Sequence, residues 1–315
     1  MGRYLLGRAA QAVAVLFVVS TLTFVMVTLA PGGPEIMMTM ESTPEQREAL
    51  TRQLGLDQPL LVRYVKWIGS AVRADFGRSF SDRRKVNEVI RERLPNTLLL
   101  GGTAFALSIL IGIPAGIISA TRRYSNADHA VTFFSFIGVS IPAFWFAILL
   151  ILLFAVRLSW LPASGMATPG VPFSLADRLS HLVLPALVLA TATLPNLVRF
   201  MRSALIEEIG QDYVRTARAK GLPGRQVLAR HAIRNALIPV VTVLGVLVPR
   251  LVGGAVITET IFGWPGMGQL AVGATIGRDF PLIMGLTVVV AIVVILSNLL
   301  VDLAYGWLDP RITYT

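Results

Sequence analysis

The chain has 315 residues, of which 54% are hydrophobic and 15% charged, and it carries a formal net charge of +10. This composition is too apolar and too poor in charge for a typical soluble domain. The absence of cysteine excludes disulfides, thiolate metal sites and thiol catalysis. A net positive charge is typical of nucleic-acid-binding proteins, but membrane proteins commonly carry an excess of Lys and Arg as well. The positions of the charges are therefore more informative than the net charge.

Six long apolar windows account for the composition, and each is near the ~20 residues that a helix needs to cross a bilayer. They are Ala9–Ala30, Thr97–Ala120, Val131–Val156, Leu182–Val198, Asn235–Ile257 and Leu282–Val301. Five hold no charged residue, and the fifth in order holds only Arg250. The sequence therefore predicts an all-α integral membrane protein with six transmembrane helices.

The predicted division follows these windows along the chain. It comprises an N-terminal segment 1–8, spans at 9–30, 96–120, 129–156, 181–200, 235–258 and 281–304, outer segments 31–95, 157–180 and 259–280, a cytoplasmic loop 201–234 and a tail 305–315.

Charge sets the expected orientation. An even number of spans puts both termini on one side. If that side is the cytoplasm, its short segments hold thirteen Lys and Arg residues against three in the two short outer loops. The positive-inside rule then predicts cytoplasmic N- and C-termini, with an uncleaved first span. The loop 31–95 is too long for the rule to apply.

This long loop begins with Pro31-Gly32-Gly33-Pro34, which stops any helix. A helix is expected from about Ser42 to Gly55, and a second from Gln58 to Ala74 with Pro59 in its first turn. We expect a small helical cap on the outer face. Two roles stay open for it: a packed connection, or a docking surface for a substrate-binding protein.

Glycine and proline mark the second and third spans. Small residues such as Gly112 and Gly116 permit close helix approach, and Pro114 and Pro142 are positioned to kink their spans.

The polar, basic stretch from Phe200 to Ile238 lies between two apolar windows. Ile206, Ile209, Tyr213 and Ala217 are spaced three and four apart, which predicts one face of a helix. Pro223-Gly224 breaks that helix. A short amphipathic helix held between spans suits insertion into a partner's groove. A solvated loop helix or a basic helix on anionic lipid are the alternatives.

Catalytic motifs are missing. There is no Walker lysine motif, no lipase-like G-x-S-x-G and no H-E-x-x-H, and the three histidines form no ligand spacing. The chain is predicted not to be an enzyme. Burying the charge of Arg250 in the middle of a span costs free energy. The side chain is therefore expected either to line a pathway, where Glu259 or Asp279 could pair with it, or to extend to the outer membrane interface. Capping and turn formation are the alternative roles of the two acids.

Several strings resemble one family. DYVRTARAKGL followed by RHAIRNALIPVV resembles the cytoplasmic coupling loop of ABC importer permeases in the peptide branch. Anchoring the family's EAA motif on Gly221 puts Arg215, Thr216 and Ala217 at the EAA positions, where only Ala217 and Gly221 match strictly. LGLDQPLLVRYVKWIGSAVRADFGRSF, VNEVIRERLPNTL, GVSIPAFWFAILL and ITETIFGWPGMGQLAVGAT are also similar to the family, so the resemblance covers nearly the whole chain.

The resemblance implies the type I ABC importer permease fold, in the bacterial cytoplasmic (inner) membrane. It implies a second, homologous permease subunit, two ATPase subunits and an extracytoplasmic substrate-binding protein as partners, with membrane lipid around them and no nucleic acid. ATP and Mg²⁺ are expected on the ATPases, with no cofactor or metal in this chain. Contacts to the ATPases are expected from the helix near 206–221, through Ile209, Asp212, Tyr213, Ala217, Arg218, Lys220 and Gly221.

The implied function is half of the translocation pathway for di- or oligopeptides. A nickel chelate, glutathione, haem or a sugar-peptide are alternative substrates for the same machinery. A secondary transporter and a non-transporting scaffold are the rival classes, and the chain shows neither the internal repeat nor the set of mid-membrane charges typical of a secondary transporter.

Overall fold

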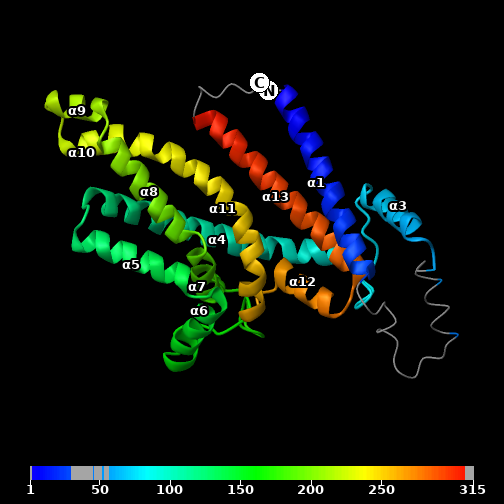
Figure 1. Ribbon diagram of the computed structural model, residues 1–315. Helices are drawn as coiled ribbons and strands as arrows, with labels where there is room; N and C mark the ends of the chain where they lie inside the picture. The colour runs from blue at the N-terminus through cyan, green and yellow to red at the C-terminus, as the bar shows by residue number, and fades with distance from the viewer. Residues whose placement is uncertain (1, 30–44, 46–51, 53–56, 309–315) are drawn as a thin grey trace. The chain divides into compact units, whose positions relative to one another are not determined.

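The computed structural model describes residues 2–29, 45, 52 and 57–308, and these ranges contain helices and no β-strand (Figure 1). The elements in chain order are α1 (Gly2–Leu29), α3 (Leu60–Ala71), α4 (Val86–Thr121), α5 (Asn126–Ser140), α6 (Ala143–Leu150), the π-helical η2 (Ile151–Arg157), α7 (Leu175–Thr191), α8 (Leu194–Ile209), α9 (Asp212–Ala219), α10 (Gly224–Val227), the π-helical η3 (Leu228–Ile233), α11 (Arg234–Ile261), α12 (Met267–Ile276) and α13 (Phe280–Leu308).

Four helices are long and apolar enough to cross a membrane: Leu6–Leu29, Val86–Thr121, Gly224–Gly245 and Phe280–Leu300. Two further spans are bent pairs. Asn126–Gly138 and Ala143–Arg157 meet at 103°, and Leu175–Thr191 and Leu194–Ile209 meet at 53°. The described part of the chain thus allows up to six spans, the number that the apolar windows predict.

The bends follow from local sequence. Pro142 is the N-cap of α6 and lies in the first break, as predicted for this proline. The second break, at Ala192 and Thr193, ends just before Pro195 at the start of α8, a position where a proline is tolerated. The predicted fourth span, 181–200, runs across this break. Its predicted limits as a membrane segment stay a prediction.

The chain forms two compact units, which are described separately. The first contains residues 1–96 and 266–295, and the second contains 97–265 with 296–314.

In the first unit, α3 lies against α1. The Tyr64 hydroxyl is 2.9 Å from the Ser20 hydroxyl and 2.6 Å from the Thr21 hydroxyl, and its ring lies 5.1 Å from the Phe24 ring. The predicted helix 58–74 is thus confirmed with narrower limits. The other predicted helix, 42–55, falls outside the described residues except for Glu45 and Arg52. A buried cluster joins Val86 and Ile90 of α4 to α12 and α13.

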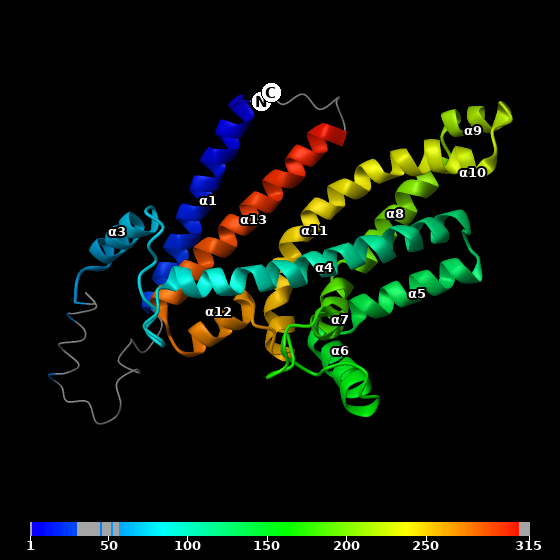
Figure 2. The ribbon, with the colours of Figure 1, turned by 180° about the vertical axis from the view of Figure 1, so that it is seen from behind.

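In the second unit, α8 packs against α5 and α11, and α11 lies beside α8 in both views (Figures 1 and 2). α4 approaches α8 through glycine. A Cβ at Gly112 would stand 3.0 Å from Leu197 Cδ2, and one at Gly116 would stand 2.6 Å from Met201 Cβ and 2.9 Å from the Val198 carbonyl oxygen. Small residues spaced four apart therefore bring the two helices together, as the sequence predicts.

This close approach predicts that Gly116→Ala lowers stability by about 1–3 kcal/mol, because the added methyl overpacks the α4–α8 contact. Gly102→Ala on the same helix is the matched control, since nothing lies within 4 Å of its Cβ position. We expect it to be neutral, or stabilising by up to about 1 kcal/mol. Thermal unfolding of the purified proteins in detergent measures both. Equal unfolding temperatures for the two variants would contradict the packing.

Candidate functional site

The helix predicted from Ile206 through Ala217 is two helices. α8 ends at Ile209, Gly210 accommodates the turn, and α9 begins at Asp212 after an extended Gln211. The prediction that Ile206, Ile209, Tyr213 and Ala217 share one continuous helix face is therefore wrong. Ile206 and Ile209 pack inward at the end of α8, whereas Tyr213 is 38% exposed on α9. Glycine, the residue most costly in a helix interior after proline, ends α8 here.

α9 ends in a Schellman motif built on Gly221. The Gly221 amide donates to the Arg218 carbonyl at 3.0 Å, and the Leu222 amide donates to the Ala217 carbonyl at 3.4 Å. Gly221 has a φ of +78°, a left-handed conformation that disfavours other residues. Leu222 then packs on the cluster that contains Ala217, which is the hydrophobic contact typical of this motif. The chain therefore turns back at Gly221, and Pro223 becomes the N-cap of α10.

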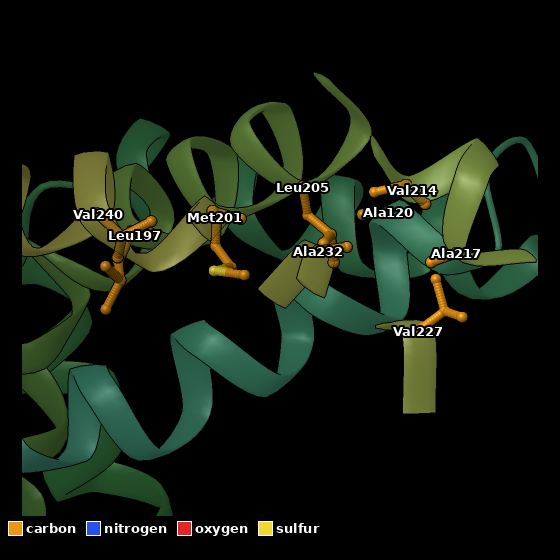
Figure 3. Close-up of a cluster of buried hydrophobic side chains, with 10 residues drawn as sticks. Ala120, Leu197, Met201, Leu205, Val214, Ala217, Val227, Ala232 and Val240 are labelled. Carbon is orange, nitrogen blue, oxygen red and sulfur yellow. The ribbon is translucent and has the colours of Figure 1, made fainter. Parts of the chain in front are cut away.

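Two side chains hold α9 in place. Val214 and Ala217 are 1% and 7% exposed, and they belong to a buried cluster with members from α4, α8, η3 and α11 (Figure 3). The labelled members are Ala120, Leu197, Met201, Leu205, Val214, Ala217, Val227, Ala232 and Val240. Ala217, one of the predicted partner contacts, thus faces the interior of the protein. Its role in this structure is to seat α9.

Polar contacts fix the flank of α9. The Tyr213 hydroxyl donates to the Glu208 carboxylate and accepts from Asn235 Nδ2 at 2.9 Å, which ties α9 to both α8 and α11. Burial and the neighbouring Glu208 raise the pKa of Tyr213, so its hydroxyl stays protonated as a donor. Tyr213 is therefore partly a tether, and its exposed edge remains on the surface.

The outward face of α9 consists of Asp212, Arg215, Thr216 and Ala219, all exposed and spaced three, four and seven apart. Asp212 lies in the first turn and Arg218 in the last, so both charges complement the helix dipole. Arg218, Lys220 and Gly221 are also exposed at its end. Arg215, Thr216 and Ala219 are missing from the predicted contacts. A helical pattern with Val214 and Ala217 on its buried face would have predicted these three residues on the exposed face.

An ion pair between Asp128 and Arg202 stabilises the position of α8, the helix that precedes α9. Asp128 of α5 is 3% exposed and accepts from Arg202 of α8 at 2.9 Å from Nε and 2.8 Å from Nη2. Ser119 of α4 donates to the same carboxylate, and the Tyr124 amide donates at 3.0 Å. A cavity of about 320 Å³ between α5 and α8 adjoins this pair. Donors from three segments thus converge on the carboxylate of Asp128.

The predicted pathway residues lie elsewhere. Asp279 is fully buried in the first unit, where Ser79 Oγ donates to it at 2.5 Å and the Leu282 amide at 3.2 Å, so it caps the start of α13. Glu259 is fully buried in the second unit and accepts from Thr97 Oγ1 at 2.6 Å. Arg250 belongs to α11, and its side chain is outside the described residues. A gating role for these three stays a prediction.

Two family models match the chain. Residues 112–314 match the "Binding-protein-dependent transport system inner membrane component" and residues 1–101 match the N-terminal "Binding-prot-dependent transport system membrane comp". The chain belongs to this family of transport permeases. The predicted resemblance to ABC importer permeases is thereby confirmed. The prediction that the chain is a permease subunit and not an enzyme is confirmed as well.

Similar proteins agree with this assignment. The chain is 44% identical to the oligopeptide transport system permease protein AppB of Bacillus subtilis, over all of both chains. It is 37% identical to the dipeptide transport system permease protein DppB of Escherichia coli, over all of this chain and 99% of that one. An inward-facing structure of the MetNI methionine ABC transporter matches with a TM-score of 0.58 at 20% identity, over 70% of this chain and 96% of that chain.

The fold is therefore that of type I ABC importer permeases, as predicted, and the protein is a multi-pass protein of the bacterial inner membrane.

The left-handed Gly221 predicts a graded cost of substitution. No atom lies within 4 Å of its Cβ position, so only backbone strain opposes a side chain, at about 1 kcal/mol for alanine and more for valine. Asparagine should cost least, since it tolerates this conformation. Limited trypsin cleavage after Arg218 and Lys220 reports the loosening of α9 and should increase in the order Asn, Ala, Val. Gly224→Ala, at an open position without positive φ, is the control. An order unrelated to backbone preference would contradict the assignment.

The Asp128–Arg202 pair predicts that Asp128→Asn destabilises the protein by about 2–3 kcal/mol, because Arg202 keeps its charge without a counterion. The exposed pair Asp212–Arg215, at 3.4 Å, is the comparison, and Asp212→Asn should change stability by less than about 1 kcal/mol. Thermal unfolding in detergent measures both. Adding Arg202→Gln to Asp128→Asn should restore part of the loss. Additive losses would show that the pair is not coupled.

Proposed function

We propose that this permease forms half of the translocation pathway of an ATP-driven importer for di- or oligopeptides and couples to ATPase subunits through α9. The observation that carries the proposal is the construction of α9, an eight-residue helix with one face seated in a buried cluster and the other face open. An isolated helix of this length is unstable in water. Its rigid seating therefore suits a surface element that must transmit force without unfolding.

The route of transmission runs from α9 into the spans. Val214 and Ala217 share a cluster with Leu205 and Met201 of α8 and with Ala236 and Val240 of α11. Displacing α9 thus displaces the ends of two long helices together. In alternating access, closure of the ATPases would push α9, and the spans would rock as rigid bodies.

The proposed assembly contains this chain, a second homologous permease, two ATPases that hold ATP and Mg²⁺, and an extracytoplasmic substrate-binding protein. No cofactor is proposed in this chain. The distribution of Lys and Arg supports cytoplasmic termini and a cytoplasmic α9, where soluble ATPases can reach it. The predicted contacts Asp212, Arg218, Lys220 and Gly221 are retained, and Arg215, Thr216 and Ala219 join them.

The peptide substrate rests on the names of the relatives, AppB and DppB, which are oligopeptide and dipeptide transport permeases. A nickel chelate, glutathione or haem carried by the same machinery is the alternative. A gradient-driven secondary transporter is the rival class, and membership of a binding-protein-dependent family weighs against it.

Two alanines on opposite faces of α9 provide a matched test. The chain has no cysteine, so Ala219→Cys and Ala217→Cys each introduce a single thiol, one exposed and one buried. In membranes that contain the co-expressed ATPase subunits, Ala219→Cys should crosslink to an ATPase cysteine and respond to nucleotide. Ala217→Cys should crosslink at least tenfold less. Failure of Ala219→Cys and Thr216→Cys to crosslink, in folded protein, would remove the proposal.

A further inference from the structure

The first unit contains a cationic cavity beside α3. Its volume is about 470 Å³, and its lining includes Arg52, Arg63 and Lys66, with Asp75 as its acidic residue. Asp75 Oδ1 already accepts from the Gly77 amide at 3.0 Å, and Lys66 Nζ donates to Gln58 Oε1 at 2.8 Å. Among the described residues, no carboxylate forms an ion pair with Arg63 or Lys66. The cavity therefore favours an anion.

Two residues that line the cavity also favour the binding of an anion. Partial burial lowers the pKa of Arg63, which reflects the cost of desolvating a cation that a bound anion would offset. Trp67 also lines the cavity, and within the described part of the protein its buried Nε1 has no hydrogen-bond partner. An unpaired buried donor is costly, so an entering oxygen acceptor would relieve it.

α3 lies beside the half of the first span that ends at Leu29. Its Tyr64 hydroxyl contacts Ser20 and Thr21 of α1, which are nine and eight residues before the end of the span at Leu29. At 1.5 Å per residue, this contact is roughly 12–14 Å inside the end of the span. The cavity is also lined by Phe280 and Pro281, the first residues of the span that ends at Leu300. The Tyr64 contact thus lies in the half of the span that ends at Leu29, and the Phe280 and Pro281 wall of the cavity lies at the end of a span, where headgroups meet acyl chains.

The outer face of α3 is apolar in a strict helical pattern. Leu61, Val65, Ile68 and Val72 follow one another at intervals of four, three and four, and Leu61, Val65 and Val72 are 74%, 61% and 81% exposed. Arg63 and Lys66 are on the opposite side of the helix, facing the cavity. An apolar stripe opposed by cations is the pattern of a helix lying in the membrane interface.

We propose that this cavity binds the phosphodiester headgroup of an anionic phospholipid while the Leu61–Val72 stripe of α3 rests among acyl chains. The lipid would come from the leaflet at the Leu29 end of α1, which is the outer leaflet in the proposed orientation. A soluble anion would use the cations and leave the stripe exposed, whereas an amphiphile uses both. The proposal does not rest on the substrate or on the ATPase contact, so it stands or falls apart from them.

The test measures lipid retention by the full-length purified protein with native mass spectrometry. Phosphatidylglycerol and phosphatidylcholine of identical chains are the probes, and glycerol phosphate represents the headgroup alone. The wild type should retain phosphatidylglycerol over phosphatidylcholine, and glycerol phosphate should not displace it at equal concentration. Arg63→Gln combined with Lys66→Gln should reduce that preference by on the order of twenty-fivefold, about fivefold per cation.

Arg73→Gln combined with Arg91→Gln removes the same charge from exposed positions that do not line the cavity, and it should change the preference less than twofold. Leu61→Asn combined with Val65→Asn should weaken lipid binding and leave binding of glycerol phosphate unchanged. Equal losses in both charge variants, or no preference in the wild type, would overturn the proposal. So would displacement by glycerol phosphate, or a cavity variant that keeps lipid and loses only the substrate-binding protein.

Discussion

The buried cluster around Val214 and Ala217 is the constraint on which the functional surface depends. Eight residues cannot sustain a helix in water, so α9 exists because it buries two side chains against α8, η3 and α11. Burying a valine contributes roughly 1.5–3 kcal/mol, which is comparable to the cost of ordering a few residues. The same contact that makes α9 a helix also joins it mechanically to two long helices. Stability and transmission therefore share one cause.

The other contacts of this region keep the element rigid. Gly221 ends α9 abruptly, the Tyr213 hydroxyl joins α8 to α11, and the Asp128–Arg202 pair fixes α8 against the start of α5. Gly116 lets α4 approach α8 closely enough for that pairing to form beside it. A rigid seat matters because a force applied to a loose helix would be lost in local rearrangement.

The two units differ in where they place their apolar and polar side chains. In the second unit, long helices pack through small residues, and buried polar groups are paired between helices, as in Thr97 of α4 with Glu259 of α11. In the first unit, α3 lies beside α1 with an exposed apolar stripe and a cationic inner face. In the lipid-binding proposal, α3 of the long loop after the first span is an element of the membrane interface.

The sequence by itself determined the class of the protein, the six apolar segments, the break at Pro142 and the end of a helix before Pro223-Gly224. These depend on composition and on residues with restricted or unusual backbone preferences, which act locally. Only the tertiary structure decided that α8 and α9 are separate helices, that Ala217 faces inward and that Arg215, Thr216 and Ala219 face outward. It also decided that Asp279 caps α13 and that Asp128 reaches Arg202. The physical reason is distance along the chain: which face of a short helix is buried depends on neighbours many residues away, and periodicity alone cannot identify them.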